Sequence, residues 1–393
     1  MHTLGLTGIT RPVWILGVVS FLADLSGELV YPIIPLFLTG TLGAPVLAVG
    51  IIEGVAEGTA NITKLITGRL SDRWRARKPF IVAGYGLGAV GKLILGLSPA
   101  WGFALVGRSA DRFGKGLRGA PRDALLSDYA EDRYRGRVFG FHRAMDSLGA
   151  VFGPLLGLAV LALDGSLRLA ILLAVVPGIL SVLALRWLPE KAAERTGPAE
   201  TAAYGAFPRS FYLLLGAIMI FSVGNSSDAF LILRSKDVGL STTLVVLAYV
   251  TYNVVYTALS YPAGVLSDHV PRSWLLVAGY LIFAAVYAGF AFVDTGAWVW
   301  PLFAVYGAYI AFTDGVSKAL VSDLVPREMR STAQGLFQGT TGLAALAASV
   351  GAGILWQYVS HETPFLLGAS CAAVGALVLA GLTVSGSLRP QAR

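Results

Sequence analysis

The sequence predicts an all-α integral membrane protein with twelve transmembrane helices in two pseudo-symmetric six-helix bundles. Three observations predict this fold: a low content of charge, a series of long apolar runs, and one long polar stretch between two sets of runs. Of the 393 residues, 55% are hydrophobic and 13% are charged, whereas soluble domains carry about 25% charged residues. So few charges cannot cover the surface of a folded protein in water. We therefore expect lipid to surround this protein.

Twelve apolar runs are long enough to cross a bilayer, which takes about 20 residues per helix. The first set lies near 13–38, 45–68, 79–98, 101–121, 138–162 and 168–188. The second set lies near 210–233, 243–266, 274–293, 298–320, 336–358 and 364–386. The short alternating segments of a β-barrel are absent from the sequence, so each run is expected to form a helix that satisfies its own backbone.

The polar stretch between the two sets is expected to be a cytoplasmic linker. It occupies 189–209 and separates an N-terminal bundle, 1–188, from a C-terminal bundle, 210–393. The start of the chain does not read as a cleavable signal peptide, because the first apolar run is too long and no small-residue cleavage site follows. Cys371 lies in an apolar run and is expected to be a small buried residue.

Basic residues concentrate in alternate loops, and this distribution predicts the orientation. Cytoplasmic loops are enriched in Lys and Arg. The basic loops contain Arg69, Arg73, Arg75, Arg77 and Lys78; Arg122, Arg133, Arg135 and Arg137; Lys191, Arg195 and Arg209; Arg272; and Arg327 and Arg330. Arg234 and Lys236 are the main exception. We therefore expect both termini in the cytoplasm and the protein in a bacterial cytoplasmic (inner) membrane. The topology explains the net charge of +7, so no nucleic-acid partner is expected.

Short motifs recur in the two halves of the sequence. Gly-Arg-Leu-Ser-Asp at 68–72 is echoed by Gly-Val-Leu-Ser-Asp at 264–268, and Ala-Leu-Leu-Ser-Asp at 124–128 by Ala-Leu-Val-Ser-Asp at 319–323. Internal repeats of this kind are typical of transporters in which two halves move about a central site.

The first of these motifs resembles the loop signature of the major facilitator superfamily, Gly-x-Leu-Ala-Asp-Arg-x-Gly-Arg-Lys between helices 2 and 3. Gly68, Asp72 and Arg73 match it, whereas Arg75 replaces its second Gly. Gly68 would let two helices approach closely, and Asp72 could face a helix N-terminus and an Arg. The second copy, which ends at Asp268, is weaker. A charged turn that only fixes the topology is the alternative interpretation.

The fifth predicted helix resembles the antiporter motif of the same superfamily, Gly-x-x-x-Gly-Pro-x-x-Gly-Gly. The match runs from Gly149 through Gly153 and Pro154 to Gly157, and Leu158 replaces the last Gly. Small residues four apart permit close helix packing and Pro bends a helix, which ordinary packing would also use. The resemblance implies a secondary transporter, not an enzyme, that works as a monomer without a cofactor, with export slightly favoured over import.

Charged residues inside the predicted helices carry the functional prediction, since each costs about 2.5–3.5 kcal/mol at a helix centre. Asp24 and Glu28 lie one turn apart in the first helix, as do Glu53 and Glu57 in the second. Burial disfavours an ionised carboxylate and a nearby Arg favours it, so a solute that competes for that Arg changes the affinity for a proton. We expect these four carboxylates, the first pair foremost, to carry coupled protons. The fifth helix adds His142, Arg143 and Asp146; His142 could titrate or bond a backbone carbonyl.

The fourth predicted helix carries a basic stripe at positions 108, 112, 115, 118 and 122, which follow helical spacing. In the superfamily that the chain resembles, helices 1, 4, 7 and 10 line the central cavity. The resemblance therefore implies cavity residues beyond the first helix: Arg108, Asp111, Arg112, Lys115, Asn225, Asp228, Asp314 and Lys318. Structural ion pairing among them is the alternative.

Together these features predict a proton-coupled transporter of a small organic or amphiphilic solute, with lipid, protons and that solute as partners. An anionic solute would suit the basic stripe, whereas a cation would suit Asp24, Glu28 and Asp228, so the charge of the solute stays open. A transporter of divalent metals or metal chelates is one alternative, and a non-transporting receptor or scaffold is another. The sequence has no Walker loop and no His and Cys cluster with zinc-site spacing.

Overall fold

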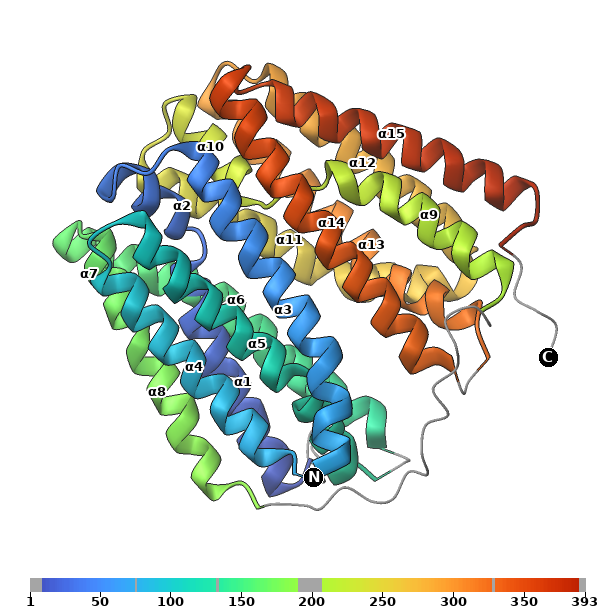
Figure 1. The fold of residues 1–393 in the computed structure, drawn as a ribbon, viewed down its shortest axis with the longest axis horizontal. Helices are drawn as coiled ribbons and strands as arrows, with labels where there is room; N and C mark the ends of the chain where they lie inside the picture. The colour runs from blue at the N-terminus through green and yellow to red at the C-terminus, as the bar shows by residue number, and fades with distance from the viewer. Residues whose placement is uncertain (1–8, 75, 132–133, 190–206, 327–328, 389–393) are drawn as a thin grey trace, which may run out of the picture. The chain divides into compact units, whose positions relative to one another are not determined.

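The computed structural model describes residues 9–74, 76–131, 134–189, 207–326 and 329–388. Over these residues the chain is helical and forms no β-strand (Figure 1), which confirms the predicted all-α fold. Most of the predicted linker lies outside the described residues, as do Arg75, Arg133, Lys191, Arg195 and Arg327 of the basic loops.

The helices fall into two compact units. Unit 1 comprises Met1–Gly43 and Thr59–Arg195, and unit 2 comprises Ala44–Gly58 and Thr196–Arg393. One long helix, α3, contributes its first part to unit 2 and the rest to unit 1. The predicted domain limits at 188 and 210 divide the sequence differently at this helix, and they stay a prediction.

The order of elements follows the predicted runs closely. The part of the chain up to the linker forms α1 (Arg11–Val30), α2 (Ile34–Leu36), the π-helical turn η1 (Phe37–Thr41), α3 (Val46–Trp74), α4 (Lys78–Leu97), α5 (Trp101–Tyr129), α6 (Arg135–Asp164), α7 (Leu167–Leu173), α8 (Val175–Ala184) and η3 (Leu185–Trp187). The part after it forms α9 (Arg209–Gly224), α10 (Ala229–Asp237), α11 (Thr242–His269), α12 (Arg272–Phe292), η5 (Gly296–Trp298), α13 (Val299–Asp323), α14 (Arg330–Tyr358) and α15 (Thr363–Val384).

Three predicted membrane helices are interrupted, the sixth only by the single turn residue Ala174 between α7 and α8. The first apolar run is divided between α1 and α2 by a turn at Tyr31–Ile33, where Pro32 and Pro35 remove backbone donors. The seventh run is divided between α9 and α10 by a non-helical segment at Asn225–Asp228. Non-helical backbone within a membrane is tolerated where protein or a cavity surrounds it.

Eleven helical stretches of the described chain are long and apolar enough to cross a membrane. The predicted run at 101–121 is not among them, although it corresponds to α5, whose 29 residues span about 44 Å. The basic stripe, Asp111 and Asp123 lower the mean hydropathy of α5. By composition alone, α5 is therefore too polar to be recognised as a membrane span. Three cationic side chains of α5, those of Arg108, Arg112 and Arg118, are each buried, whereas Lys115 is exposed.

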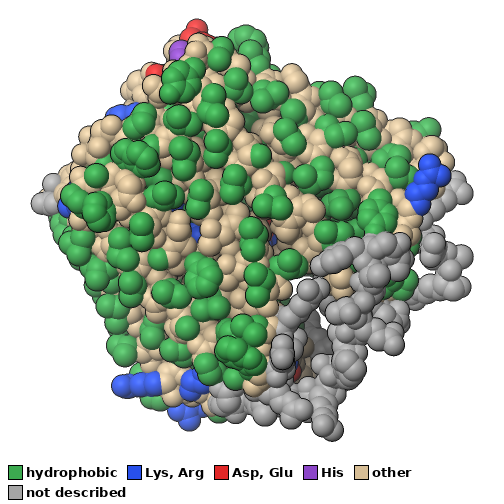
Figure 2. All heavy atoms as spheres, in the orientation of Figure 1, with side chains coloured by type: hydrophobic (Ala, Val, Ile, Leu, Met, Phe, Trp, Pro, Cys, Tyr) green, Lys and Arg blue, Asp and Glu red, His purple; other side chains and the backbone are tan. Residues whose placement is uncertain are grey.

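Hydrophobic side chains cover the face of the molecule in Figure 2, and Lys and Arg appear there mostly toward its margins. Large apolar residues are strongly exposed on several helices, including Leu163 at 90% and Leu377 at 71%. An apolar surface of this extent would be a liability in water but is what hydrocarbon requires. The chain is therefore a multi-pass membrane protein.

Glycines let the helices of unit 1 approach each other to backbone contact. α4 lies along α5, and α1 lies along α6 (Figure 1). A Cβ on Gly84 of α4 would lie 2.7 Å from the Gly114 carbonyl oxygen of α5, and one on Gly91 would lie 2.6 Å from that of Gly107. No side chain fits at such distances, so the α4–α5 pair depends on these small residues.

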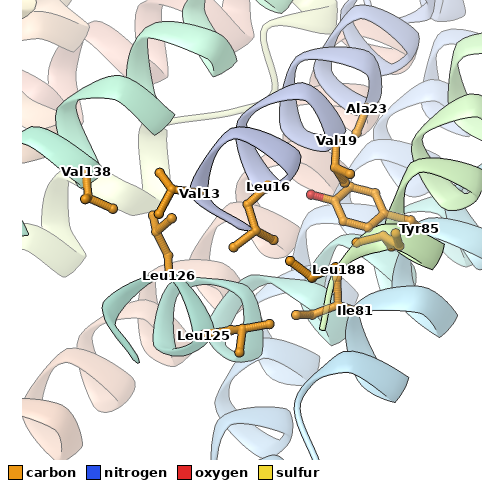
Figure 3. Packing of buried hydrophobic residues seen from close by; sticks show 11 residues of the cluster. Val13, Leu16, Val19, Ala23, Ile81, Tyr85, Leu125, Leu126, Val138 and Leu188 are labelled. Atoms are coloured by element: carbon orange, nitrogen blue, oxygen red, sulfur yellow. The ribbon is translucent and has the colours of Figure 1, made fainter. Parts of the chain in front are cut away.

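The core of unit 1 fills the space that the helix pairs enclose. Leu16 and Val19 of α1 converge there with Ile81 and Tyr85 of α4 and Leu125 of α5 (Figure 3), and all five side chains are at least 97% buried. This core fixes α1, α4 and α5 around the charged residues that the next section describes.

The core of unit 2 contains a group of stacked aromatic rings in addition to aliphatic side chains. Phe221 of α9 stacks on Tyr280 of α12 with ring centroids 4.0 Å apart, and Phe283 stacks on Tyr287 at 3.9 Å. Tyr306 of α13 adds its ring to the same group, 6.3 Å from Phe283. Buried tyrosines bring hydroxyl groups into the core, and these usually find a polar partner.

Candidate functional site

The two carboxylates of the first helix face α6. A Cβ on Gly149 would lie 2.9 Å from the Cβ of Asp24, and one on Gly153 would lie 3.0 Å from the Cβ of Glu28. The antiporter-like motif therefore forms the surface against which both acidic residues of α1 lie. The bend residue Pro154 lies inside α6, directly after this contact.

Asp24 is half-buried and lies among charges of both signs. Its carboxylate forms no hydrogen bond or ion pair within the described part of the chain. The charged groups within electrostatic range are Asp146 on α6 and Lys115, Arg118 and Arg122 on α5. The cationic side chains of the predicted stripe thus surround the carboxylate that the sequence favoured as proton carrier.

Arg122 joins α5 to α1 at one end of this group. Its Nη1 donates to the Ser20 hydroxyl at 3.0 Å, while Nε and Nη2 donate to Asp123 at 3.2 and 3.1 Å. Because these donors are already used, the guanidinium balances Asp24 only at a distance.

Asp111 pairs with a lysine that the sequence analysis did not single out. Lys92 of α4 donates to Asp111 Oδ1 at 2.7 Å, and Arg108 Nη1 lies 3.5 Å from Oδ2. Lys92 is 7% exposed. A lysine in the middle of the run at 79–98 was a signal that could have found it, because an ionisable residue inside a membrane helix needs a partner.

Arg108 and Arg112 both lie over one aromatic ring. Their guanidinium carbons are 5.4 and 5.5 Å from the centroid of Tyr31, the residue that begins the break after α1. Both contacts are within cation–π range. Tyr31 was not predicted, since nothing in its spacing shows that it meets α5.

Arg118 lies over the ring of Tyr85 at 4.4 Å, next to a small internal cavity. The cavity has a volume of about 10 Å³ and is lined in part by Ser26, Lys92, Arg118 and Ser181. This volume accommodates about one water molecule.

The second predicted pair of carboxylates lies in unit 2. Glu53 and Glu57 occupy the first part of α3, and Glu53 is 2% exposed. This part of α3 packs closely on α14, because a Cβ on Gly50 would lie 2.4 Å from the Ser349 carbonyl oxygen. The predicted proton carriers are therefore divided between the two units.

The polar residues predicted in the seventh helix lie in the break between α9 and α10. Tyr306 donates its hydroxyl proton to Asp228 Oδ1 at 2.6 Å, and Asn225 Nδ2 donates to the Tyr309 hydroxyl at 3.4 Å. The Tyr287 hydroxyl donates to the Ser226 carbonyl at 3.3 Å. Tyrosines of α12 and α13 thus hold the non-helical segment, and sequence reasoning missed all three.

Asp314 and Lys318 pair with each other along α13. Lys318 Nζ lies 2.7 Å from Asp314 Oδ1, and the Tyr256 hydroxyl of α11 donates to Oδ2 at 3.5 Å. The side chain of Lys318 is 46% exposed. The two residues therefore form the ion pair that the alternative interpretation expected. Their role in binding a solute stays a prediction.

Part of the predicted gating motifs can be placed. Gly68 faces α5, with its Cβ position 3.4 Å from the Cβ of Ala120. The side chains of Asp72, Arg73 and Asp268 lie outside the described residues. Among the described His, Cys, Asp and Glu residues, no group of three or more is arranged to hold a metal ion.

Comparison with known proteins gives concordant matches. The family model described as Major Facilitator Superfamily matches residues 16–234 and 212–392. An uncharacterised MFS-type transporter of Methanocaldococcus jannaschii is 37% identical over 380 residues, 94% of this chain and 94% of that protein. The multidrug resistance protein MdtH of Aeromonas hydrophila is 26% identical over 351 residues, 88% of this chain and 87% of that protein.

Solved transporter structures share the fold. A POT family transporter in complex with 5-aminolevulinic acid superposes with a TM-score of 0.81 at 13% identity, covering 97% of this chain and 98% of that one. The nucleoside transporter NupG superposes with a TM-score of 0.76 at 15% identity, covering 95% and 99%. At these identities the likeness concerns the fold alone.

Proposed function

Because the chain belongs to the major facilitator superfamily of membrane transporters, we propose that it exchanges a small amphiphilic organic solute for protons. Transport by a chain of this family is the premise, and it excludes an enzyme. Proton coupling, export and the class of solute are the proposal. The observation that carries it is Asp24, a carboxylate at membrane depth without an ion pair in the described structure.

Proton coupling is supported by the surroundings of Asp24. An ionised carboxylate at membrane depth is costly unless it is paired, and the cations nearest to Asp24 act on it only at a distance. A change in the position of Lys115 or Arg122 would therefore change how tightly Asp24 holds a proton. This is the linkage that exchange requires. Glu28, Glu53 and Glu57 remain proposed as further proton carriers.

The proposed solute is organic because aromatic rings accompany the charges in both units. Tyr31 lies beneath Arg108 and Arg112, and Tyr306 contacts Asp228. Aromatic faces next to a few charged groups suit amphiphilic molecules. In unit 1, Arg108 and Arg112 suit an anionic group, and in unit 2, Asp228 suits a cationic one. We propose Asp111, Lys115, Asn225, Asp314 and Lys318 as residues that support these contacts.

Export is supported by two observations. The antiporter-like motif packs directly behind Asp24 and Glu28, and the similar protein MdtH is named for multidrug resistance. The alternating basic loops support cytoplasmic termini in a bacterial cytoplasmic membrane. We propose a monomer as the working unit.

The test is proton flux in sealed liposomes that contain the purified protein and an internal pH indicator. Lipophilic cations, organic anions and divalent metal ions are added outside as separate pools. We expect one of the two organic pools to trigger proton movement, and Asp24→Asn to abolish it. Asp294→Asn, which neutralises an exposed carboxylate between α12 and η5, is the matched control. Flux triggered only by metal ions, or retained in Asp24→Asn, contradicts the proposal.

A further inference from the structure

Asp146 of α6 is a buried carboxylate whose hydrogen bonds are incomplete. Its side chain is 14% exposed, and its Oδ2 lies 3.5 Å from Nδ1 of His142, one turn earlier on the same helix. Its Oδ1 is enclosed and has no hydrogen-bond partner in the described structure, and the same holds for Nε2 of His142. A buried polar atom without a partner is costly and needs an explanation. Two such atoms on neighbouring residues indicate a site at which a proton is bound and released.

Asp146 lies on the side of α6 that meets α1 at Asp24. Gly149, three residues after Asp146 and therefore on the same helix face, contacts the α1 backbone: its Cβ position is 2.7 Å from the Phe21 carbonyl oxygen and 2.9 Å from the Asp24 Cβ. Asp146 is also the negatively charged group that acts most strongly on Asp24. The two carboxylates therefore belong to residues that lie near each other at the α1–α6 contact.

The charges around this pair come from α5 and α6. Lys115, Arg118 and Arg122 act on Asp24, and Arg122, Asp123 and Arg143 act on His142. The closest contacts of Arg122 are with Ser20 and Asp123. Within the described structure, neither Asp24 nor Asp146 forms an ion pair with Lys or Arg. Two neighbouring carboxylates in this situation repel each other, and one bound proton relieves the repulsion.

We propose that Asp24 and Asp146 together bind a single proton, and that His142 is the positioning residue that orients the Asp146 carboxyl group. The inference rests on the proposed proton exchange and names the group that would carry the proton. A neutral His142 with its hydrogen on Nδ1 can donate to Asp146 Oδ2. The shared proton then lies on Oδ1 of Asp146 or on Asp24. A proton shared in this way belongs to the pair and not to one of the two groups.

Infrared difference spectroscopy of the purified full-length protein tests the pair directly. Protonated carboxyl groups give a C=O band that ionised ones lack, and an exposed Asp is ionised at neutral pH. We expect a protonated-carboxyl band at neutral pH that Asp24→Asn and Asp146→Asn each remove to the same extent. The double variant should remove no more than either single one, because one proton is shared. Asp294→Asn is the control and should leave the band unchanged.

Other results overturn the proposal. A band that persists in Asp146→Asn, or losses that add up in the double variant, would mean that the two carboxylates bind protons independently. The absence of any protonated-carboxyl band in the wild-type protein would mean that the pair is ionised.

His142→Leu keeps both carboxyl groups and tests the positioning role, also if Asp146→Asn fails to fold. Removing the imidazole should shift the position of the carboxyl band without reducing its area, because Asp146 loses its neighbour at Oδ2. An unchanged band position overturns the role of His142. A band that disappears overturns a purely positioning role.

The inference and the proposed function can fail separately. The infrared measurement needs no solute. It therefore tests the shared proton even if none of the solute pools triggers proton flux in liposomes. Solute-triggered flux that survives in Asp146→Asn would leave proton exchange standing and overturn this pair as its carrier.

Discussion

Arg272 at the start of α12 forms an ion pair with Asp323 at the end of α13. Arg77, directly before α4, forms the corresponding pair with Asp128 near the end of α5. Asp128 and Asp323 are the last residues of the two repeated Ala-Leu-x-Ser-Asp motifs. The repeat therefore places a carboxylate at the end of one helix against an arginine at the start of another, once in each unit.

The two pairs should differ in strength because they differ in burial. The side chains are 24% and 36% exposed in the Arg272–Asp323 pair but 10% and 25% in the Arg77–Asp128 pair. Asp323→Asn should therefore cost about 0–1 kcal/mol of stability. Asp128→Asn should cost more, up to about 3 kcal/mol, since it deprives a buried arginine of a carboxylate. Thermal unfolding in one detergent compares them, and a larger loss in Asp323→Asn would contradict the prediction.

Lys92 and Asp111 should behave as one unit in a double-mutant cycle. Lys92→Met or Asp111→Asn alone deprives a buried charge of its closest partner, at a cost of up to about 3–5 kcal/mol. The double variant should lose clearly less than the sum, because it removes both charges of a pair that is 2.7 Å apart. Unfolding free energies of the four proteins measure the coupling. Additive losses would show that the pair is not coupled.

The α1–α6 contact should not tolerate a methyl group. In Gly149→Ala the new Cβ would meet the Phe21 carbonyl oxygen at 2.7 Å, so we expect a loss of about 1–3 kcal/mol from overpacking. Gly140→Ala on the same helix is the matched control, because nothing lies within 4 Å of its Cβ position. It should keep or raise stability by up to about 1 kcal/mol through its helix propensity. Equal unfolding temperatures for the two variants would mean that the close contact at Gly149 does not contribute to stability.

Tyr306 should hold the break between α9 and α10. Tyr306→Phe removes the 2.6 Å hydrogen bond to Asp228, and a hydrogen bond to a charged group contributes about 1.5–3 kcal/mol. Tyr280→Phe is the control, since Tyr280 is also a buried residue but its hydroxyl forms no hydrogen bond within the described residues. We expect thermal unfolding to show a larger loss for Tyr306→Phe, together with weaker solute-triggered flux in liposomes. A larger loss in Tyr280→Phe would mean that aromatic packing alone stabilises the segment.

The sequence predicted the helices well because hydropathy depends only on local composition. Prediction from the sequence was less successful for contacts that depend on how the helices pack against each other. The position of Asp111 in a basic stripe was visible, but its partner Lys92 lies nineteen residues earlier on α4, and nothing in the spacing shows that the two helices face each other. Tyr31 was missed for the same reason, because it meets Arg108 and Arg112 only once α1 and α5 are packed.

Local pattern was also insufficient where a helix is interrupted. The polar residues at 225–228 were recognised as unusual, but the periodicity of the flanking apolar residues continues through them. Tyrosines of other helices contact this break: the Tyr287 hydroxyl donates to the Ser226 carbonyl, and two further tyrosine hydroxyls bond the side chains of Asn225 and Asp228. The same limit applies to the carboxylates. The pair formed by Asp24 and Glu28 is visible in the sequence because both lie on one helix. Asp146 comes near Asp24 only through the contact at Gly149.

The glycine contacts of unit 1 limit how its helices can move. Where backbone touches backbone, as at Gly91 against Gly107 or Gly149 against Phe21, a helix cannot slip along its neighbour without driving larger side chains into the same narrow space. Each pair therefore keeps a fixed register. We expect α4 and α5 to move together as a rigid body, and α1 and α6 to do the same. Within unit 1, neither of these two pairs can therefore rearrange by sliding one helix along its partner.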